Sequence, residues 1–461
     1  MIRRLIAAVG VVLPLGLLAM IPPQGLGPEG LKALALAVFA ISFFVAETIP
    51  LAWTGLILLL LFVLLGVVSP SVAFSGFTSS AFWLVFASFL LGGGMLRTGL
   101  ARRMAFAFIR ALGNRYDRVV MGFCVLGFLL SFGVPSGNAR VALLIPIALE
   151  IAAAFGLPLK SRGCAGLALA VAMSAFFPGF ALLPSNVPNL VHAGVIESVG
   201  GPAISYGLWA ALHLPVLGVA RVAMIYVVIR LFLWPKEVPV LKGESLGAGD
   251  AGPLSPDEWK MIALIGIAIG LWVTDFIHGI KPVWVGLGAA MATLLPGVGV
   301  LGKKDVVRCV NLPLLVYLAS ILALGRVLAA TGVSRWVGEY IIRVIPLAEM
   351  GSNEQVAVVA LITLSLAILT TQPAVPAVLT PIIVAYATDH GLDVTRLVMA
   401  QVLGIGICFF PYQTPPLVNA QGYGAFTGRQ VLRVLIPFAV LSVILVIPLT
   451  ILYWRWIGFL P

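Results

Sequence analysis

Apolar runs close to the length of a bilayer crossing recur along this sequence from end to end. They occupy residues 5–22, 31–49, 51–69, 163–183, 202–233, 258–279 and 429–458. About 20 helical residues span the ~30 Å hydrocarbon core of a membrane. Only 10% of the 461 residues are charged, whereas a soluble domain carries roughly a quarter. The sequence therefore predicts an all-α polytopic membrane protein.

Positive charge gathers between these runs, since the chain has 28 Lys and Arg against 17 Asp and Glu. The basic groups are Arg3/Arg4, Arg102/Arg103/Arg110/Arg115/Arg118, Lys160/Arg162, Lys236/Lys242, Lys303/Lys304/Arg308 and Arg429/Arg433. If all of them lie on one side, the positive-inside rule makes that side cytoplasmic. We therefore expect a cytoplasmic N-terminus in the inner (plasma) membrane, with anionic lipid and no nucleic acid as the partner of the charge. No small-x-small cleavage site follows Pro23, which favours a first transmembrane helix over a signal peptide.

A polar stretch divides the chain nearly in half. Residues 236–258 contain acidic side chains and Gly-Ala-Gly and Gly-Pro turns, which predict a cytoplasmic linker between an N-terminal half, 1–235, and a C-terminal half, 259–461. The halves share three landmarks in the same order. The paired segments are 86–90 with 318–322, 135–140 with 370–376, and 184–189 with 411–416. Such pairs indicate an internal structural duplication.

Each half also contains two apolar arms that are too short to cross the membrane separately. Residues 119–133 and 141–156 meet at a polar break that begins at Pro135, and both flanks are basic. Both ends should then lie on the cytoplasmic side, as in a re-entrant hairpin over 119–156. The second hairpin, 355–388, should enter from the opposite face. We expect an inverted repeat of two halves, with about 11 transmembrane helices, two re-entrant hairpins and a site at the midplane.

The polar breaks at the hairpin tips suit an anion. Where one helix ends and another begins, free backbone N–H groups and the positive end of a helix dipole point into the cavity. Small polar side chains add donors, and the prolines either shape the neighbouring loops or only kink helices. We predict substrate binding by Ser136, Asn138, Arg140, Asn186, Pro188, Asn189, Thr371, Gln372, Thr414 and Pro415. Oxygen atoms in this set also suit a hard cation.

Arg140 is the most informative of these residues. A guanidinium near the bilayer centre costs about 2.5–3.5 kcal/mol on insertion scales, so it is usually paired or functional. One interpretation is a salt bridge to Glu47, Glu150 or Asp275, or a side chain that snorkels to the surface. The interpretation we favour is that Arg140 presents its fork of donors to a substrate carboxylate or oxyanion. Its fixed charge would then replace part of what a bound cation supplies.

These motifs resemble those of the divalent anion:sodium symporters, which include bacterial dicarboxylate and citrate carriers and plastid 2-oxoglutarate/malate translocators. The hairpin tips of that family carry Ser-Asn-Thr-Ala before an apolar helix with a proline. Counted back from Pro146, its first three positions correspond here to Ser136, Gly137 and Asn138. Arg140 falls on the arginine of the Ser-Asn-Thr-Ala-Arg variant, which is typical of the plastid-type exchangers.

The resemblance extends over nearly the whole chain. The second motif and the two later loops are matched by Thr371-Gln372-Pro373, Pro188-Asn189 and Thr414-Pro415-Pro416. The family would imply an outer scaffold that forms a homodimer and an inner transport domain that carries both hairpins by elevator-type alternating access. It would place substrate between the tips and a sodium ion at each. The possible sodium ligands are Ser136, Gly137, Asn138 and Thr371.

The sequence departs from the family pattern at three positions. Gly137 replaces an asparagine, Pro373 replaces a threonine, and Leu417 stands where the second loop usually has asparagine. These departures put the sodium site of the second tip in doubt more than that of the first. Sodium symport, proton coupling and sodium-independent exchange therefore stay open.

We interpret the chain as a secondary active transporter of a small anion, either a di- or tricarboxylate or sulfate. The alternatives are a transporter for arsenite or another inorganic ion, and an anion channel. An enzyme is disfavoured because no span contains a paired acidic or His/Glu metal motif and no Ser/His constellation can be placed. The four cysteines lack CxxC spacing, so disulfides and metal sites are not expected. The expected cofactor content is none, apart from Na+ as a possible coupling ion.

Overall fold

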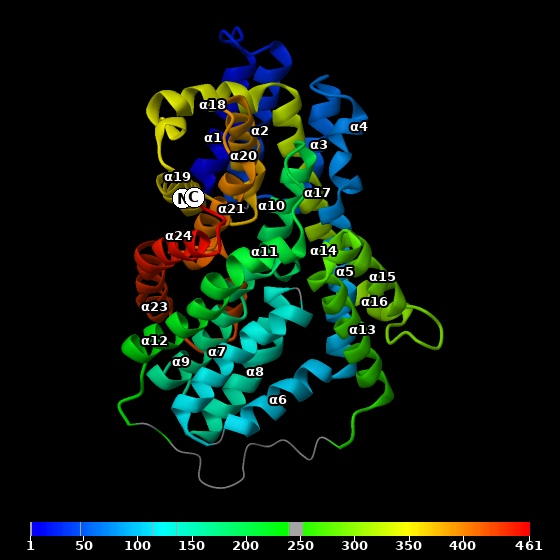
Figure 1. The fold of residues 1–461 in the computed structure, drawn as a ribbon, viewed down its shortest axis with the longest axis vertical. Coiled ribbons are helices and arrows are strands. Elements are labelled where there is room, and N and C mark those ends of the chain that lie inside the picture. The colour runs from blue at the N-terminus through cyan, green and yellow to red at the C-terminus, as the bar shows by residue number, and fades with distance from the viewer. Residues whose placement is uncertain (1, 47, 113, 135, 238, 240–251) are drawn as a thin grey trace.

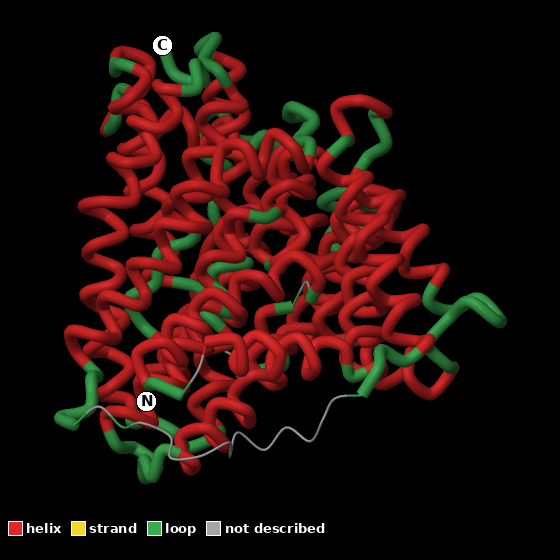
Figure 2. The backbone as a smooth tube through the Cα atoms, turned by 60° about the horizontal axis from the view of Figure 1, so that its bottom comes forward, coloured by secondary structure: helices red, strands yellow, loops and turns green. Residues whose placement is uncertain are grey.

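The computed structural model consists of helices joined by turns and loops (Figures 1 and 2). It describes residues 2–461 apart from 47, 113, 135, 238 and 240–251. Among these residues there is no strand, and 7 helical stretches are long and apolar enough to cross a membrane. They are Ser80–Arg97, Tyr116–Gly133, Gly137–Ala154, Arg162–Ala181, Tyr206–Phe232, Leu312–Ala330 and Gly428–Trp456. The predicted all-α membrane fold is confirmed.

The same succession of helices occurs twice along the chain. The first comprises α5 (Ser80–Thr98), α6 (Leu100–Leu112), α7 (Tyr116–Gly133), α8 (Gly137–Ala154), α9 (Arg162–Ser174), η2 (Phe177–Ala181), η3 (Leu183–Ser185), α10 (Val187–Ser198), α11 (Tyr206–His213), η4 (Leu214–Ala220) and α12 (Arg221–Phe232). The second comprises α17 (Leu312–Ala330), α18 (Val333–Val344), η5 (Leu347–Glu349), α19 (Ser352–Leu369), α20 (Ala374–Asp389), α21 (Val394–Ile405), η6 (Pro411–Gln413), α22 (Pro415–Gly422), α23 (Gly428–Leu441), η7 (Ser442–Val446) and α24 (Ile447–Trp456). Each succession ends in a long helix interrupted by a π-helical segment, η4 or η7. The order of the helices thus repeats as the paired landmarks predict.

Further helices precede each succession. Before the first come α1 (Ile2–Leu18), α2 (Pro28–Ala46), α3 (Leu51–Leu64), α4 (Pro70–Ala73) and η1 (Ser75–Thr78). Before the second come α13 (Pro256–Val273), α14 (Asp275–His278), α15 (Pro282–Ala292) and α16 (Lys303–Cys309). Several apolar helices of 10–17 residues, including α3, α15 and α21, are too short to be counted as spans by length alone. The predicted boundaries of the two halves stay a prediction, since most of the linker lies outside the described residues.

A glycine in the left-handed region follows the first helix of each succession. Gly99 has φ +76° and Gly332 has φ +78°, a conformation that residues with a Cβ rarely adopt. The chain then enters an amphipathic helix, α6 or α18. In Figure 1 these two helices lie at opposite ends of the molecule, with α7 and α8 toward the α6 end and α19 and α20 toward the α18 end. This placement agrees with hairpins that enter from opposite faces.

The hairpin of each half packs against a short helix of the other half. Helix α22 contacts α8 and α9, whereas α10 contacts α20 and α21. His192 of α10 joins these elements directly, because its Nδ1 lies 3.0 Å from Thr380 Oγ1 and its Nε2 lies 2.7 Å from the carbonyl oxygen of Val398. Any site at a tip is therefore built from both halves of the chain.

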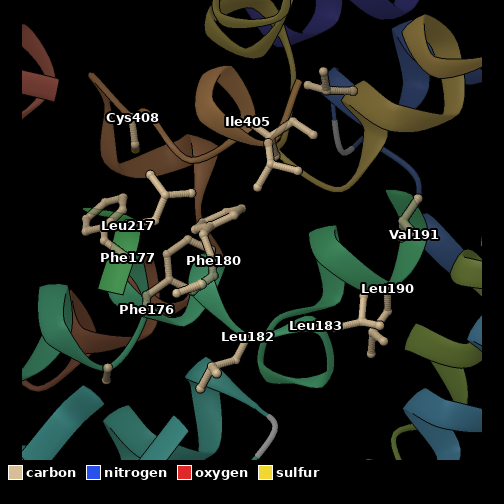
Figure 3. Close-up of a cluster of buried hydrophobic side chains, with 14 of the residues drawn as sticks. Phe176, Phe177, Phe180, Leu182, Leu183, Leu190, Val191, Leu217, Ile405 and Cys408 are labelled. Carbon is tan, nitrogen blue, oxygen red and sulfur yellow. The ribbon is translucent and has the colours of Figure 1, made fainter. Parts of the chain in front are cut away.

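An aromatic cluster fills the space around the irregular segment after α9 (Figure 3). Phe176 packs on Phe177 and Phe180, with ring centroids 5.6 and 5.4 Å apart. Leu217 of η4 and Cys408, which follows α21, belong to the same buried core. Irregular backbone at membrane depth is stable only where protein buries it or where it lines a water-filled cavity. The cluster provides that burial for η2 and η3.

Candidate functional site

The first tip is the break between α7 and α8. Ser136 caps α8, because its Oγ accepts a hydrogen bond from the backbone N–H of Ala139 at 3.3 Å. The next residue, Gly137, is closely packed against Phe176 and Pro416. A Cβ at this position would lie 2.9 Å from a Phe176 ring carbon and 3.0 Å from Pro416 Cγ. The space that an asparagine would need is occupied. Gly137 thus offers only backbone groups to a ligand.

Arg140 lies directly behind this tip and is 0% exposed. Its Nε donates to the carbonyl oxygen of Ala175 at 2.7 Å, and its Nη1 donates to the carbonyl oxygens of Val134 and, at 3.3 Å, Ser185. Its Nη2 donates to Asn186 Oδ1 at 3.0 Å. Val134 caps the C-terminus of α7 and Ala175 caps that of α9. The guanidinium therefore faces the negative ends of two helix dipoles, and one of its five N–H groups has no bond in this set.

The acidic partners considered for Arg140 are placed differently. Asp275 Oδ2 accepts from the backbone N–H of Tyr206 at 2.7 Å. Glu150 is exposed on α8, and Glu47 lies outside the described residues. Among the described residues, the partners of the Arg140 guanidinium are three peptide carbonyls and the Asn186 amide oxygen, which stabilise the buried charge.

Two predicted ligands, Asn186 and Asn189, bind the backbone of their own loop. Asn186 Nδ2 donates to the carbonyl oxygen of Phe176 at 2.9 Å. Asn189 Nδ2 donates to the carbonyl oxygens of Gly179 and Leu182 at 3.1 and 2.8 Å. Both side chains are buried. Their amide groups fix the shape of the irregular segment, and Pro188 is buried between them in the first turn of α10.

The second tip lies between α19 and α20 and is held by its own later loop. Gln372 donates from its backbone N–H to the carbonyl oxygen of Gln413 at 3.2 Å and from Nε2 to that of Ile405 at 2.8 Å. Ile405 is the last residue of α21, so the neutral side-chain amide of Gln372 binds the C-terminal end of this helix. In the first half, the charged side chain of Arg140 binds the corresponding end of α9. At this tip and its later loop, four buried oxygen atoms have no hydrogen-bond partner: Thr370 Oγ1, Thr371 Oγ1, Gln372 Oε1 and Thr414 Oγ1. We expect a ligand or water to bind these oxygens, because a buried oxygen without a hydrogen bond lowers the stability of the protein.

The sequence did not single out Asn419, which connects the two halves. Asn419 Nδ2 donates to Asn138 Oδ1 at 2.8 Å, from α22 to the start of α8. Asn419 is exposed, as is Pro415, whereas Asn138 is half-buried. Asn419 follows Pro416 by three residues, so both lie on the face of α22 that packs against α8. The sequence did contain a signal for this residue, since Asn419 lies two positions after Leu417, which stands where the family usually has asparagine.

A second buried guanidinium, Arg221, was also missed. It opens α12 and is 0% exposed, and its Nη1 donates to the carbonyl oxygen of Phe177 at 3.4 Å. A Cβ on Gly406 would lie 2.6 Å from Nη1, and Gly406 caps the C-terminus of α21. Each of the helices α9 and α21 thus ends beside a buried arginine. The position of Arg221 inside the apolar run 202–233 was the sequence signal that could have identified it.

Each half contributes a hairpin that is broken at a polar tip inside an otherwise apolar helical protein, an arrangement typical of membrane transporters. The model of the sodium:sulfate symporter transmembrane region matches residues 2–460, and the chain belongs to this family. It is therefore a transporter of anions and not an enzyme.

Individual proteins support the same assignment. The sodium-dependent dicarboxylate transporter SdcS of Staphylococcus saprophyticus is 22% identical, and the match covers 93% of this chain and 87% of the relative. An L-tartrate/succinate antiporter of Shigella dysenteriae is 26% identical, over 84% of this chain and 80% of its own length. The solved YdaH transporter of Alcanivorax borkumensis shares the fold, with a TM-score of 0.56 and 15% identity over 84% of this chain and 86% of that one.

Proposed function

We propose that this anion transporter exchanges small dicarboxylates without binding sodium at its first tip. The observation that carries the proposal is the set of bonds around Arg140, whose guanidinium donates to the carbonyl oxygens of Val134, Ala175 and Ser185. Carbonyl oxygens are the ligands that a hard cation prefers. Since the guanidinium already takes these oxygens, a sodium ion at this tip would have to compete with it for them. Among the neighbouring described residues, Ser185 Oγ and Asn189 Oδ1 are buried oxygens without a partner. The fixed charge of Arg140 supplies the positive potential at this tip.

The anion itself would be held from both tips. The first-turn N–H groups of α8, with Ser136 and Asn138, form one set of donors, and the hydroxyl groups of Thr371 and Thr414 form the other. A dicarboxylate has two separated anionic ends and so suits two sets better than sulfate does. Four N–H groups of Arg140 are bonded to the protein, so this residue would act through its charge and by positioning the tip.

A second candidate function is symport with a single sodium ion at the second tip. The unpartnered oxygens of Thr370, Thr371, Gln372 and Thr414 favour it, because hydroxyl and amide oxygens suit a hard cation. The relative SdcS is described as sodium-dependent, whereas the tartrate/succinate relative is described as an antiporter.

The assembly and movement follow the family resemblance. We propose that the two hairpins move together with α10 and α22, because each of these short helices packs against the hairpin of the other half. The amphipathic helices α6 and α18 would connect this moving unit to a scaffold, through which two copies form a homodimer. The basic groups between the spans support a plasma-membrane location with a cytoplasmic N-terminus.

Uptake into proteoliposomes tests the proposal. Labelled succinate or labelled sulfate is supplied outside, with or without unlabelled succinate inside, in sodium medium or in medium with sodium replaced by potassium. We expect saturable succinate uptake that requires internal succinate and is unchanged by the replacement of sodium. Uptake that follows a sodium gradient into empty vesicles would instead establish the symport candidate. Conduction without saturation or counterflow would indicate a channel, and transport of sulfate alone would contradict the dicarboxylate class.

A further inference from the structure

The amide pair of Asn138 and Asn419 occupies the place where the first tip meets the second half of the chain. Asn138 lies in the first turn of α8 and Asn419 in α22, and the two side chains are joined by a hydrogen bond of 2.8 Å. Neither residue is buried. Asn186 and Gln413, by contrast, have both polar atoms of their side-chain amides bonded to the protein. This exposed pair therefore has hydrogen-bonding capacity left for a ligand.

The chemistry of that remaining capacity is specific. An asparagine side chain offers a carbonyl acceptor and an NH2 donor. When two asparagines bind each other through one N–H···O bond, an NH2 group remains available on the acceptor residue and a carbonyl oxygen on the donor residue. The same donor and acceptor remain whichever of the two amides donates. The pair thus presents one donor and one acceptor side by side.

A hydroxyl group is the complement of this arrangement, because it donates one hydrogen bond and accepts another. The neighbouring N–H groups of Gly137 and Asn138 lie in the first turn of α8, where backbone donors lack an intrahelical partner and favour a carboxylate. Because Asn138 itself carries one of these N–H groups, a carboxylate bound there would lie next to the Asn138 side chain. A 2-hydroxy carboxylate satisfies both requirements at once.

We propose that Asn138 and Asn419 form a hydroxyl-binding subsite, and that the preferred substrates are dicarboxylates with a hydroxyl group next to a carboxylate. This inference rests on the proposed dicarboxylate transport and adds the feature that distinguishes one dicarboxylate from another. Thr414, whose buried Oγ1 has no partner, caps the same helix that carries Asn419. Helix α22 thus holds unused polar groups near both of its ends.

Competition in the exchange assay tests the subsite. Unlabelled malate, which is hydroxysuccinate, and unlabelled succinate compete with labelled succinate for uptake by the wild-type protein. We expect malate to compete about tenfold more strongly, the effect of one to two additional hydrogen bonds at an accessible site. Equal competition by malate and succinate in the wild type would overturn the subsite.

Two variants locate the preference. Asn419→Ala is expected to bring the malate-to-succinate ratio close to one, whereas Gln421→Ala, which alters an exposed amide on the same helix, should keep the wild-type ratio. An unchanged ratio in Asn419→Ala would overturn the role of the pair while leaving dicarboxylate transport intact. If neither dicarboxylate competes in the wild type, the proposed function itself fails, so the two failures are distinguishable.

Discussion

Gly137 shows, at the scale of single residues, how a missing side chain shapes the first tip. The sequence marks it only as a departure from the family motif. The structure gives the reason, because Phe176 and Pro416 occupy the positions around its Cα. Packing of this kind joins segments that are far apart in the chain, so it could not be predicted from the motif itself.

Gly137→Ala should therefore reduce both stability and uptake more than a glycine-to-alanine change at an unpacked position does. The added Cβ meets a ring carbon at 2.9 Å and a proline carbon at 3.0 Å, and neither neighbour is a flexible chain end. We expect a loss of about 1–3 kcal/mol of stability, typical of overpacking, and weaker uptake. Thermal unfolding in detergent measures the first effect. The matched control is Gly266→Ala in α13, where no atom lies within 4 Å of the new Cβ, and a Gly137→Ala protein as stable and active as this control would contradict the packing argument.

For other site residues, the sequence predicted the position but not the partners, or did not predict the residue at all. Arg140 was identified from its charge within an apolar segment, yet its partners are carbonyl oxygens, which a sequence does not display. Asn419 was not identified, since its significance comes from the approach of α22 to α8. The sequence placed more doubt on sodium at the second tip, whereas our proposal, which starts from the bonds of Arg140 and the unpartnered oxygens of Thr371 and Gln372, places it at the first.

At the scale of helices, the hairpins were predictable because their signals are local. Short apolar arms, a polar break and a proline in the returning arm lie within forty or so residues of one another, and α7, α8, α19 and α20 follow them closely. The π-helical segments η4 and η7 were not predicted, since both lie within uninterrupted apolar runs. Capping is the local device that fixes where α8 begins.

Comparing two serine caps distinguishes the effect of a cap on stability from an effect on substrate binding. Ser136 caps α8 at the tip, and Ser161 caps α9, with Oγ accepting from the backbone N–H of Cys164 at 3.2 Å. Replacing either serine by alanine should cost about 1 kcal/mol of stability. Only Ser136→Ala should also raise the KM for substrate several-fold, because its hydroxyl lies at the predicted binding tip. Equal KM values for the two variants would show that Ser136 is a cap alone.

At the scale of the whole molecule, an ion pair bridges α10 and α15. Lys281 Nζ lies 2.9 Å from Glu197 Oε1, which also accepts from Ser80 Oγ of α5 at 3.2 Å. These residues line a cavity of about 250 Å³ between α5, α10 and α15. If α10 travels with the hairpins, this bridge must break once in every transport cycle.

Crosslinking this bridge should stop transport. Glu197→Cys and Lys281→Cys, combined in a Cys309→Ser background, place two thiols across the α10–α15 boundary, while Cys124, Cys164 and Cys408 are buried. A short bismaleimide should then abolish exchange by the double variant but not by either single variant. Full exchange in a protein shown by mass spectrometry to be crosslinked would contradict a movement of α10 against α15.

We propose that the guanidinium of Arg140 takes the place of a cation at the first tip, and the sodium dependence of exchange by Arg140 variants tests this. Succinate exchange is followed with and without sodium for Arg140→Ala, Arg140→Lys and the control Arg326→Ala, whose side chain is exposed. Size-exclusion chromatography confirms that each variant is folded. We predict that sodium-free exchange is lost in Arg140→Ala and retained in part by Arg140→Lys. Added sodium should partly restore exchange in Arg140→Ala, since the freed carbonyl oxygens can then bind it. Sodium-free exchange at the wild-type rate in Arg140→Ala would contradict the claim.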